Sequence, residues 1–217
     1  MKQTNLIFLL IFLCSCSNTG IYGELAQAIK ELTSKPKDLN KEKFLESPYA
    51  NIQARIGRSQ NSLIILEEVQ DDTLKWTSSN LVKIYTKNGY VVRLTGLENN
   101  LSKIVLDNDH PFSKGDLSDI SDKVFTSYYN FSNPNLFDLP VRTKFIYVGK
   151  EEINYLGDNL ITLKYEEQSL DNLIHWKFKN IFWINEKDNI LIKSKQYFTP
   201  KNPEIYIKIG KKYEKPD

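Results

Sequence analysis

A β-hairpin is encoded in residues 81–95, which read LVKIYTKNGYVVRLT. Two runs, 81–87 and 90–95, show the strand-like period of two, and the pair Asn88-Gly89 separates them. Asn-Gly is the strongest two-residue signal for a hairpin turn, because both turn positions need a positive φ that these residues tolerate. The stretch therefore predicts two neighbouring antiparallel strands.

Strand patterns continue on both sides of this hairpin, with turn signals such as Gly157-Asp158-Asn159 and residues 186–189 between them. The predicted strands lie at residues 63–66 (a buried strand), 74–78, 124–131, 160–165, 174–179, 190–198 and 205–209. Apart from 124–131, residues 107–140 are expected to be a long loop. The pattern favours a mainly β fold with one antiparallel sheet, shaped as a curved sheet, a half-barrel or a barrel.

Helical spacing occurs only before residue 50. Apolar residues at 21, 25, 28, 29 and 32 share one helical face, which predicts an N-terminal amphipathic helix. A shorter helix is expected around Lys41–Glu46, before Pro48. With neither a repeat nor a linker in the sequence, residues 21–217 are expected to form a single domain.

The composition excludes several classes of protein. Of 217 residues, 41% are hydrophobic and 26% charged, as in an ordinary globular chain. The formal charge is only +2, so a concentrated basic surface for nucleic acid is not expected. Both cysteines, Cys14 and Cys16, precede the body of the chain, which therefore contains neither a disulfide nor a thiolate metal site.

The first residues have the features of a secretory signal. The apolar run Leu6–Leu13 would rise only ~12 Å as a helix, too short to span a ~30 Å hydrocarbon core. Leu13-Cys14-Ser15-Cys16 resembles the bacterial lipobox, with cleavage between Ser15 and Cys16 and lipidation of the Cys16 thiol. The predicted boundaries are a signal peptide at 1–15 and a lipidated cysteine with its tether at 16–20.

The predicted anchor also suggests a location. Two or more acyl chains, such as palmitate, hold a protein stably in a membrane. Position 17 is Ser rather than the Asp that signals retention in enteric bacteria, which favours the outer membrane, on its periplasmic side.

Two segments resemble the YjbF/GfcB family, lipoproteins of exopolysaccharide and group 4 capsule operons. The first is Asn88–Leu97 with Leu101; the second combines Phe182–Asn185 with Ile190–Pro200. Trp76 also stands where the family tends to have Trp. The motif residues whose role is open are Trp76, Gly89, Arg93, Gly96, Leu97, Trp183, Ser194, Gln196 and Pro200.

The resemblance implies an outer-membrane-anchored accessory in exopolysaccharide or capsule secretion. Its partners would be the membrane, through the lipid, and the export machinery or the polysaccharide itself. No catalytic activity and no cofactor follow from the family, so a non-enzymatic role is expected. Two alternatives remain, a lipid-carrying half-barrel of the lipoprotein-localisation type and a polysaccharide-modifying enzyme.

The residues that commonly carry chemistry are sparse. Without a third histidine or a thiolate, His110 and His175 do not predict a zinc site, and Asp107-Asn108-Asp109 is better explained as a turn. A glycosidase needs two carboxylates across a cleft, but adjacent acids on a strand point to opposite faces. The acid pairs are expected at solvated positions: Glu67-Glu68, Asp71-Asp72, Glu151-Glu152 and Glu166-Glu167.

Aromatic and basic residues offer weaker hypotheses. Trp176 is expected in the core, whereas Trp183, on the opposite strand parity, is freer to stack on a sugar ring. Arg93 and Gln196 are expected to be buried in one polar network. The lysines of the last 25 residues predict a solvated face, or alternatively a weak attraction for acidic polymer.

Overall fold

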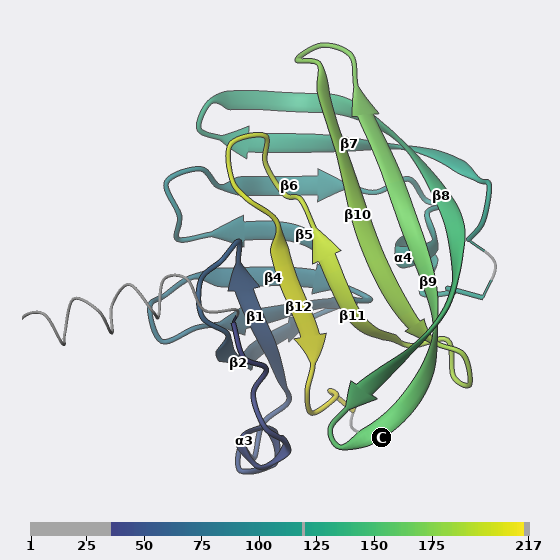
Figure 1. Ribbon diagram of the computed structural model, residues 1–217. Helices are drawn as coiled ribbons and strands as arrows, with labels where there is room; N and C mark the ends of the chain where they lie inside the picture. Colours follow the sequence, from purple (N-terminus) through teal and green to yellow (C-terminus); the bar gives the residue numbers. More distant parts are fainter. Residues whose placement is uncertain (1–35, 119, 215–217) are drawn as a thin grey trace, which may run out of the picture. The chain divides into compact units, whose positions relative to one another are not determined.

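The computed structural model describes residues 36–118 and 120–214, which fold mainly into strands (Figure 1). The strands are β1 (Asn51–Ile56), β2 (Ser62–Gln70), β3 (Thr73–Thr77), β4 (Lys83–Lys87), β5 (Tyr90–Thr95), β6 (Leu101–Val105), β7 (Val124–Ser132), β8 (Asn135–Tyr155), β9 (Asp158–Asp171), β10 (Trp176–Asn185), β11 (Leu191–Gln196) and β12 (Ile205–Ile209). Two short helices accompany them, α3 (Lys41–Leu45) and α4 (Pro111–Lys114).

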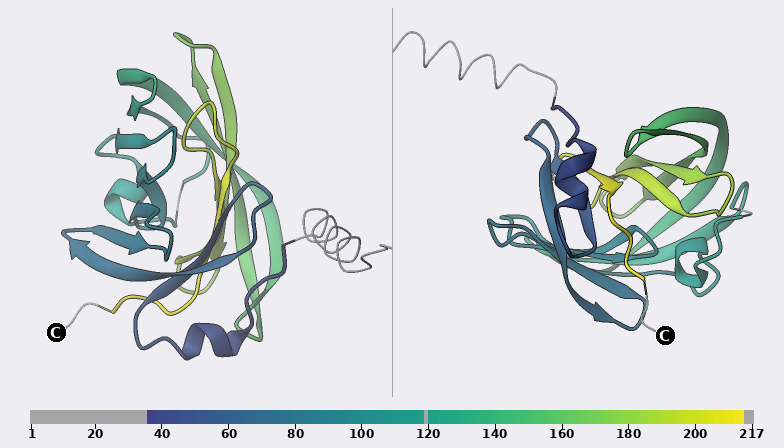
Figure 2. Two further views of the ribbon diagram at one scale, coloured as in Figure 1. Left: turned by 90° about the vertical axis from the view of Figure 1, so that its left-hand side faces the viewer. Right: turned by 90° about the horizontal axis from the view of Figure 1, so that it is seen from below.

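The sheet is an antiparallel barrel that closes on itself. Sequential strands pair from β2 to β12, and β1 lies between β12 and β2. The long strands β8, β9 and β10 curve around one side in all three views (Figures 1 and 2). The expected mainly β, antiparallel fold is therefore confirmed, and the barrel is the form it takes.

Of the predictions for the N-terminal part of the chain, only the short helix lies within the described residues. The helix expected at 21–32, the signal peptide and the lipidated cysteine lie outside the described residues. The short helix is confirmed as α3, where the Asn40 side chain accepts a hydrogen bond from the Lys43 N–H and Phe44 is buried. A single domain over 21–217 stays a prediction.

The central hairpin forms as the sequence indicates. Lys87 pairs with Tyr90, and the turn residues between them, Asn88 and Gly89, have φ values of 51° and 88°. Both are positive, as this turn demands. A second two-residue turn, Leu156-Gly157, joins β8 to β9, so the turn expected at 157–159 lies one residue earlier.

Alternation of side chains builds the core. On β7, Phe125, Tyr129 and Phe131 point inward while Val124 and Tyr128 are exposed. The stretch 63–66 alternates in the same way, and only Ile64 is buried, so the prediction of a wholly buried strand there is wrong. Aromatic rings fill much of the interior: Tyr90, Phe112, Phe125, Tyr129, Phe131, Phe145, Trp176, Phe178 and Phe182.

Strand β8 occupies part of the region that was expected to be a loop. Pro140 has no N–H to donate to a neighbouring strand, which argues against a strand in this region. It lies, however, where β8 has β7 as a neighbour but pairing with β9 begins only at Arg142. Its missing N–H therefore costs no hydrogen bond to β9. The loop expected at 107–140 shrinks to the segment around α4.

Candidate functional site

A cluster of polar side chains lies inside the barrel around Glu167 of β9. Its Oε1 accepts a hydrogen bond from the Tyr90 hydroxyl at 3.0 Å, and its Oε2 accepts one from Asn180 Nδ2 at 2.6 Å. The hydroxyls of Tyr90 and Tyr129 lie 3.0 Å apart and share a hydrogen bond. Together with His110, these residues from β5, β7, β9 and β10 form the interior polar cluster.

His110 sits in an aromatic cage beside that carboxylate. Its ring centroid is 5.3 Å from Tyr90, 5.2 Å from Phe125 and 5.6 Å from Phe145. Nε2 is 4.0 Å from the nearer oxygen of Glu167, beyond hydrogen-bond range, and neither ring nitrogen has a hydrogen-bond partner among the described residues.

Burial favours the neutral form of both titratable groups. It raises the pKa of Glu167 from its ordinary 4.5 to about 7, against the opposing effect of the hydrogen bonds from Asn180 and Tyr90. It lowers the pKa of His110 from 6.5 to about 4, while Asp107 opposes the change. Burial also raises the pKa of Tyr90 and Tyr129 above their usual range.

The cluster is a structural network in this conformation. Glu167 and His110 have no exposed surface, so a reactant in solvent does not reach them. The expectation of a solvated position for Glu167 is wrong. The expectation that adjacent acids on a strand point to opposite faces is confirmed. Glu166 points outward, where it pairs with Lys179 at 2.7 Å.

Gln196 is the motif residue with the most extensive contacts. Its Oε1 accepts the Val91 N–H at 2.9 Å, and its Nε2 donates to the Gly89 carbonyl and to Ser194 Oγ, both at 2.9 Å. One side chain of β11 thus fastens the β4–β5 hairpin across the barrel. The burial predicted for Gln196 is confirmed, but Arg93 is exposed and lies outside this network.

Two motif glycines permit close backbone approaches. A Cβ on Gly89 would lie 2.3 Å from Leu191 Cδ2, and one on Gly96 would lie 2.8 Å from the Leu81 carbonyl oxygen. Their φ values, 88° and 92°, also disfavour other residues. Leu97, which follows Gly96, donates its N–H to the Asn100 side chain. These residues shape turns.

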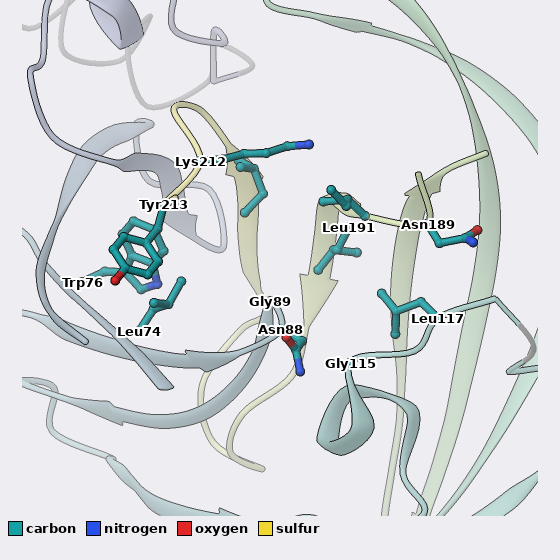
Figure 3. Close-up of a pocket in the computed structure, with 12 residues that line it drawn as sticks. Leu74, Trp76, Asn88, Gly89, Gly115, Leu117, Asn189, Leu191, Lys212 and Tyr213 are labelled. Carbon is teal, nitrogen blue, oxygen red and sulfur yellow. The ribbon is translucent and has the colours of Figure 1, made fainter. Parts of the chain in front are cut away.

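A pocket of about 270 Å³ opens beside the hairpin turn (Figure 3). Leu74, Trp76 and Tyr213 lie at one side of it, and Leu117 and Leu191 at the other (Figure 3). Trp76 is otherwise buried, and its Nε1 donates to Thr86 Oγ1 at 2.8 Å. The motif tryptophan is therefore mainly a core residue with an edge in an apolar pocket.

The other motif aromatic, Trp183, is covered. It is 6% exposed, with the ammonium groups of Lys164 and Lys193 at 5.2 and 4.6 Å from its ring centroid. The prediction that it is free to stack on a sugar is wrong, because the ring is buried and two lysine ammonium groups lie close to it. Trp176 is in the core as expected, stacked on Phe178 at 4.0 Å.

The remaining predicted residues are dispersed. Pro200 is exposed beside Tyr197, Ser15 and Cys16 lie outside the described residues, and His175 is in the exposed β9–β10 turn. Several C-terminal lysines form ion pairs: Lys195 with Glu204, Lys208 with Asp38 and Lys212 with Asp188.

Neither a metal site nor a membrane-spanning helix is found in the described part of the chain. No three His, Cys, Asp or Glu side chains there are grouped so as to hold a metal ion, and the predicted lack of a metal stays a prediction. Asp107 Oδ1 instead accepts the Asp109 N–H at 2.8 Å, as in a turn. Over the same residues, no helix is both long and apolar enough to cross a membrane.

The fold and the motifs together define a class of protein. It is an antiparallel barrel whose interior is filled by side chains and in which a glutamine of β11 holds the β4–β5 hairpin. The crystal structure of the hypothetical lipoprotein YmcC from Escherichia coli (K12) has the same fold, with a TM-score of 0.72 and 19% identity over 81% of this chain and 90% of that one. The uncharacterized lipoprotein GfcB of Escherichia coli (strain K12) is 22% identical over 150 residues, 69% of this chain and 70% of that protein.

The family follows from a match over nearly the whole described region. Residues 22–209 match YjbF, described as group 4 capsule polysaccharide lipoprotein GfcB, YjbF. The chain belongs to this family of capsule-related lipoproteins, as its two motifs predicted. The motif residues Gly89, Ser194 and Gln196 meet in one hydrogen-bonded contact, which sequence spacing did not reveal.

Proposed function

We propose that this chain is a lipoprotein anchored through Cys16 in the outer membrane, on its periplasmic side. There it assists the export or assembly of an extracellular polysaccharide without catalysing a reaction. The observation that carries the proposal is the family match over residues 22–209, which begins just after the segment that resembles a lipobox. Its partners would be the export machinery or the polysaccharide.

The interior of the barrel favours this role over the two alternatives. A lipid carrier needs a cavity for acyl chains, but aromatic rings fill the core, and the apolar pocket of about 270 Å³ is below the ~300–1,000 Å³ usual for ligand sites. A glycosidase needs two carboxylates facing a cleft. Glu167, whose pKa is raised as in a general acid, is sealed inside.

Removing the anchor is expected to abolish surface polysaccharide. A deletion strain and a Cys16→Ser strain should both lose surface-attached polymer, because an export accessory released from the membrane no longer meets its partners. The measurement compares surface and periplasmic polymer, in amount and chain length. Cys14→Ser, the same exchange two residues upstream, is the control and should match the wild type. Unchanged polymer in the deletion strain would contradict the proposal.

A further inference from the structure

A polar pocket with a volume of about 530 Å³ lies over strands β4, β5 and β6 and shares no lining residue with the apolar pocket of Figure 3. This volume is within the range of small-ligand sites. Its lining comes from the β2–β3 turn, these strands and the segment that leads into α4: Gln70, Asp71, Thr73, Tyr85, Lys87, Val92, Arg93, Ser102, Lys103, Ile104, Leu106, Asn108 and Ser113.

The charge of the lining is mainly positive. Lys87, Arg93 and Lys103 contribute cations, against the single carboxylate of Asp71. Lys87 has a distant partner, Asp72, at 3.9 Å. Within residues 36–118 and 120–214, no carboxylate forms an ion pair with Arg93 or Lys103. The pocket therefore has cationic groups available for an anion.

Arg93 is held in a position suited to recognition. Its guanidinium carbon is 5.0 Å from the centroid of the Tyr85 ring, and the two residues are direct partners on β5 and β4. A guanidinium oriented on a ring presents its planar N–H groups in a fixed fork, which matches a carboxylate in two parallel hydrogen bonds.

The other polar groups suit a sugar. Gln70 and Asn108 have amides that both donate and accept, and Ser102 and Ser113 have hydroxyl groups. The half-buried ring of Tyr85 also lines the pocket and adds apolar surface among them. Hydroxyl-bearing ligands need such mixed donors and acceptors, whereas a simple anion needs only the cations.

We propose that this pocket binds a carboxylate-bearing sugar unit of an acidic polysaccharide, with Arg93 on the carboxylate and the amides on the hydroxyls. The inference rests on the proposed role in polysaccharide export, and it names the chemical class of the polymer. It also gives a role to the exposed motif arginine, which lies outside the hydrogen-bonded network of Gln196.

Binding to a defined acidic oligosaccharide tests this site. The full-length lipidated protein, in a detergent without sugar groups, is titrated calorimetrically with tetragalacturonate, with neutral maltotetraose and with inorganic phosphate. We expect tetragalacturonate to bind, and Arg93→Gln to weaken binding about tenfold or more, the effect of losing a charge-assisted hydrogen bond. Arg142→Gln removes an exposed arginine of β8 and should leave the affinity within about twofold.

Several results would overturn the inference. One is an affinity of Arg93→Gln equal to that of the wild type. Equal binding of maltotetraose would remove the role of the carboxylate. Phosphate that binds as tightly, with the same dependence on Arg93, would make the pocket a simple anion site.

The same variant separates this inference from the proposed function. Loss of surface polymer in the deletion strain, with normal export in an Arg93→Gln strain, would overturn the sugar site alone. Normal export in the deletion strain, with Arg93-dependent binding in vitro, would instead overturn the role in export while the binding site stands.

Discussion

Replacing Gln196 by leucine is expected to lower the free energy of unfolding by about 3 kcal/mol or more. The substitution leaves the Val91 N–H, the Gly89 carbonyl and Ser194 Oγ without the partner that each has now. Each buried polar group left unpaired costs ~1–3 kcal/mol, and the gain from a buried leucine offsets only part of the sum. The loss should be large because the site is 1% exposed, so water does not replace the amide.

Urea unfolding measures this effect, with Gln168→Leu as the matched control. Gln168 lies on β9 and is exposed, so the same exchange there should change the free energy of unfolding by about 0.5 kcal/mol or less. An unchanged dependence on denaturant would show that the two folded states expose similar surface. Equal stability of the two variants would mean that the hairpin does not depend on Gln196.

Local patterns in the sequence were sufficient for the fold class. Asn88-Gly89 fixes one hairpin, and alternation on β7 and β10 marks which face is buried. Closure of the barrel was not predictable, because it depends on β1 pairing with β12, strands at opposite ends of the domain. Strand β8 was not predictable for a similar reason. Pro140 fits in it because β9 does not yet pair with β8 at that position, and the sequence does not show where this pairing begins.

The interior polar cluster was hidden for a different reason. The inward residues of β9 include Glu167, Ser169 and Asp171, so its buried face has the composition of a solvated face. Periodicity identifies two faces but does not tell which is inside when both are polar. The burial of His110 was equally hidden, since its cage comes from strands distant in sequence.

That cluster gives the barrel two opposite responses to pH. The pKa of the Glu167 carboxyl group rises from 4.5 to about 7 on folding, so the folded state keeps this proton up to a higher pH than the unfolded chain does. Its contribution to stability is complete below pH 4.5 and is lost as the pH rises through 7. At 1.36 kcal/mol per pKa unit, the contribution of Glu167 changes by on the order of 3 kcal/mol over this range.

His110 acts in the opposite direction. Its pKa falls from 6.5 to about 4 on folding, so the unfolded chain binds a proton that the folded barrel does not. Its contribution to stability is complete above pH 6.5 and is lost as the pH falls through 4, again by on the order of 3 kcal/mol. Between pH 4.5 and 6.5, the two slopes cancel in the wild type.

Single substitutions should separate the two slopes. Relative to the wild type, Glu167→Gln is expected to gain on the order of 3 kcal/mol of stability as the pH rises from 4.5 to 7. His110→Phe, which suits the aromatic cage, should gain a similar amount relative to the wild type as the pH falls from 6.5 to 4. Both follow from urea unfolding at a series of pH values.

The decisive result is that the stabilities of the two variants, each relative to the wild type, change in opposite directions with pH. Glu166→Gln is the control, because it removes the neighbouring carboxylate from the outer face and should change stability by about 1 kcal/mol or less, as for an exposed ion pair. If the stability of Glu167→Gln and of His110→Phe depends on pH as that of the wild type does, the shifted pKa values of the two buried groups would be contradicted. Tyr90 contacts both groups and lies between Gly89 and Val91, the two residues that Gln196 binds. Opposite slopes would therefore place this pH response next to the hairpin that Gln196 holds.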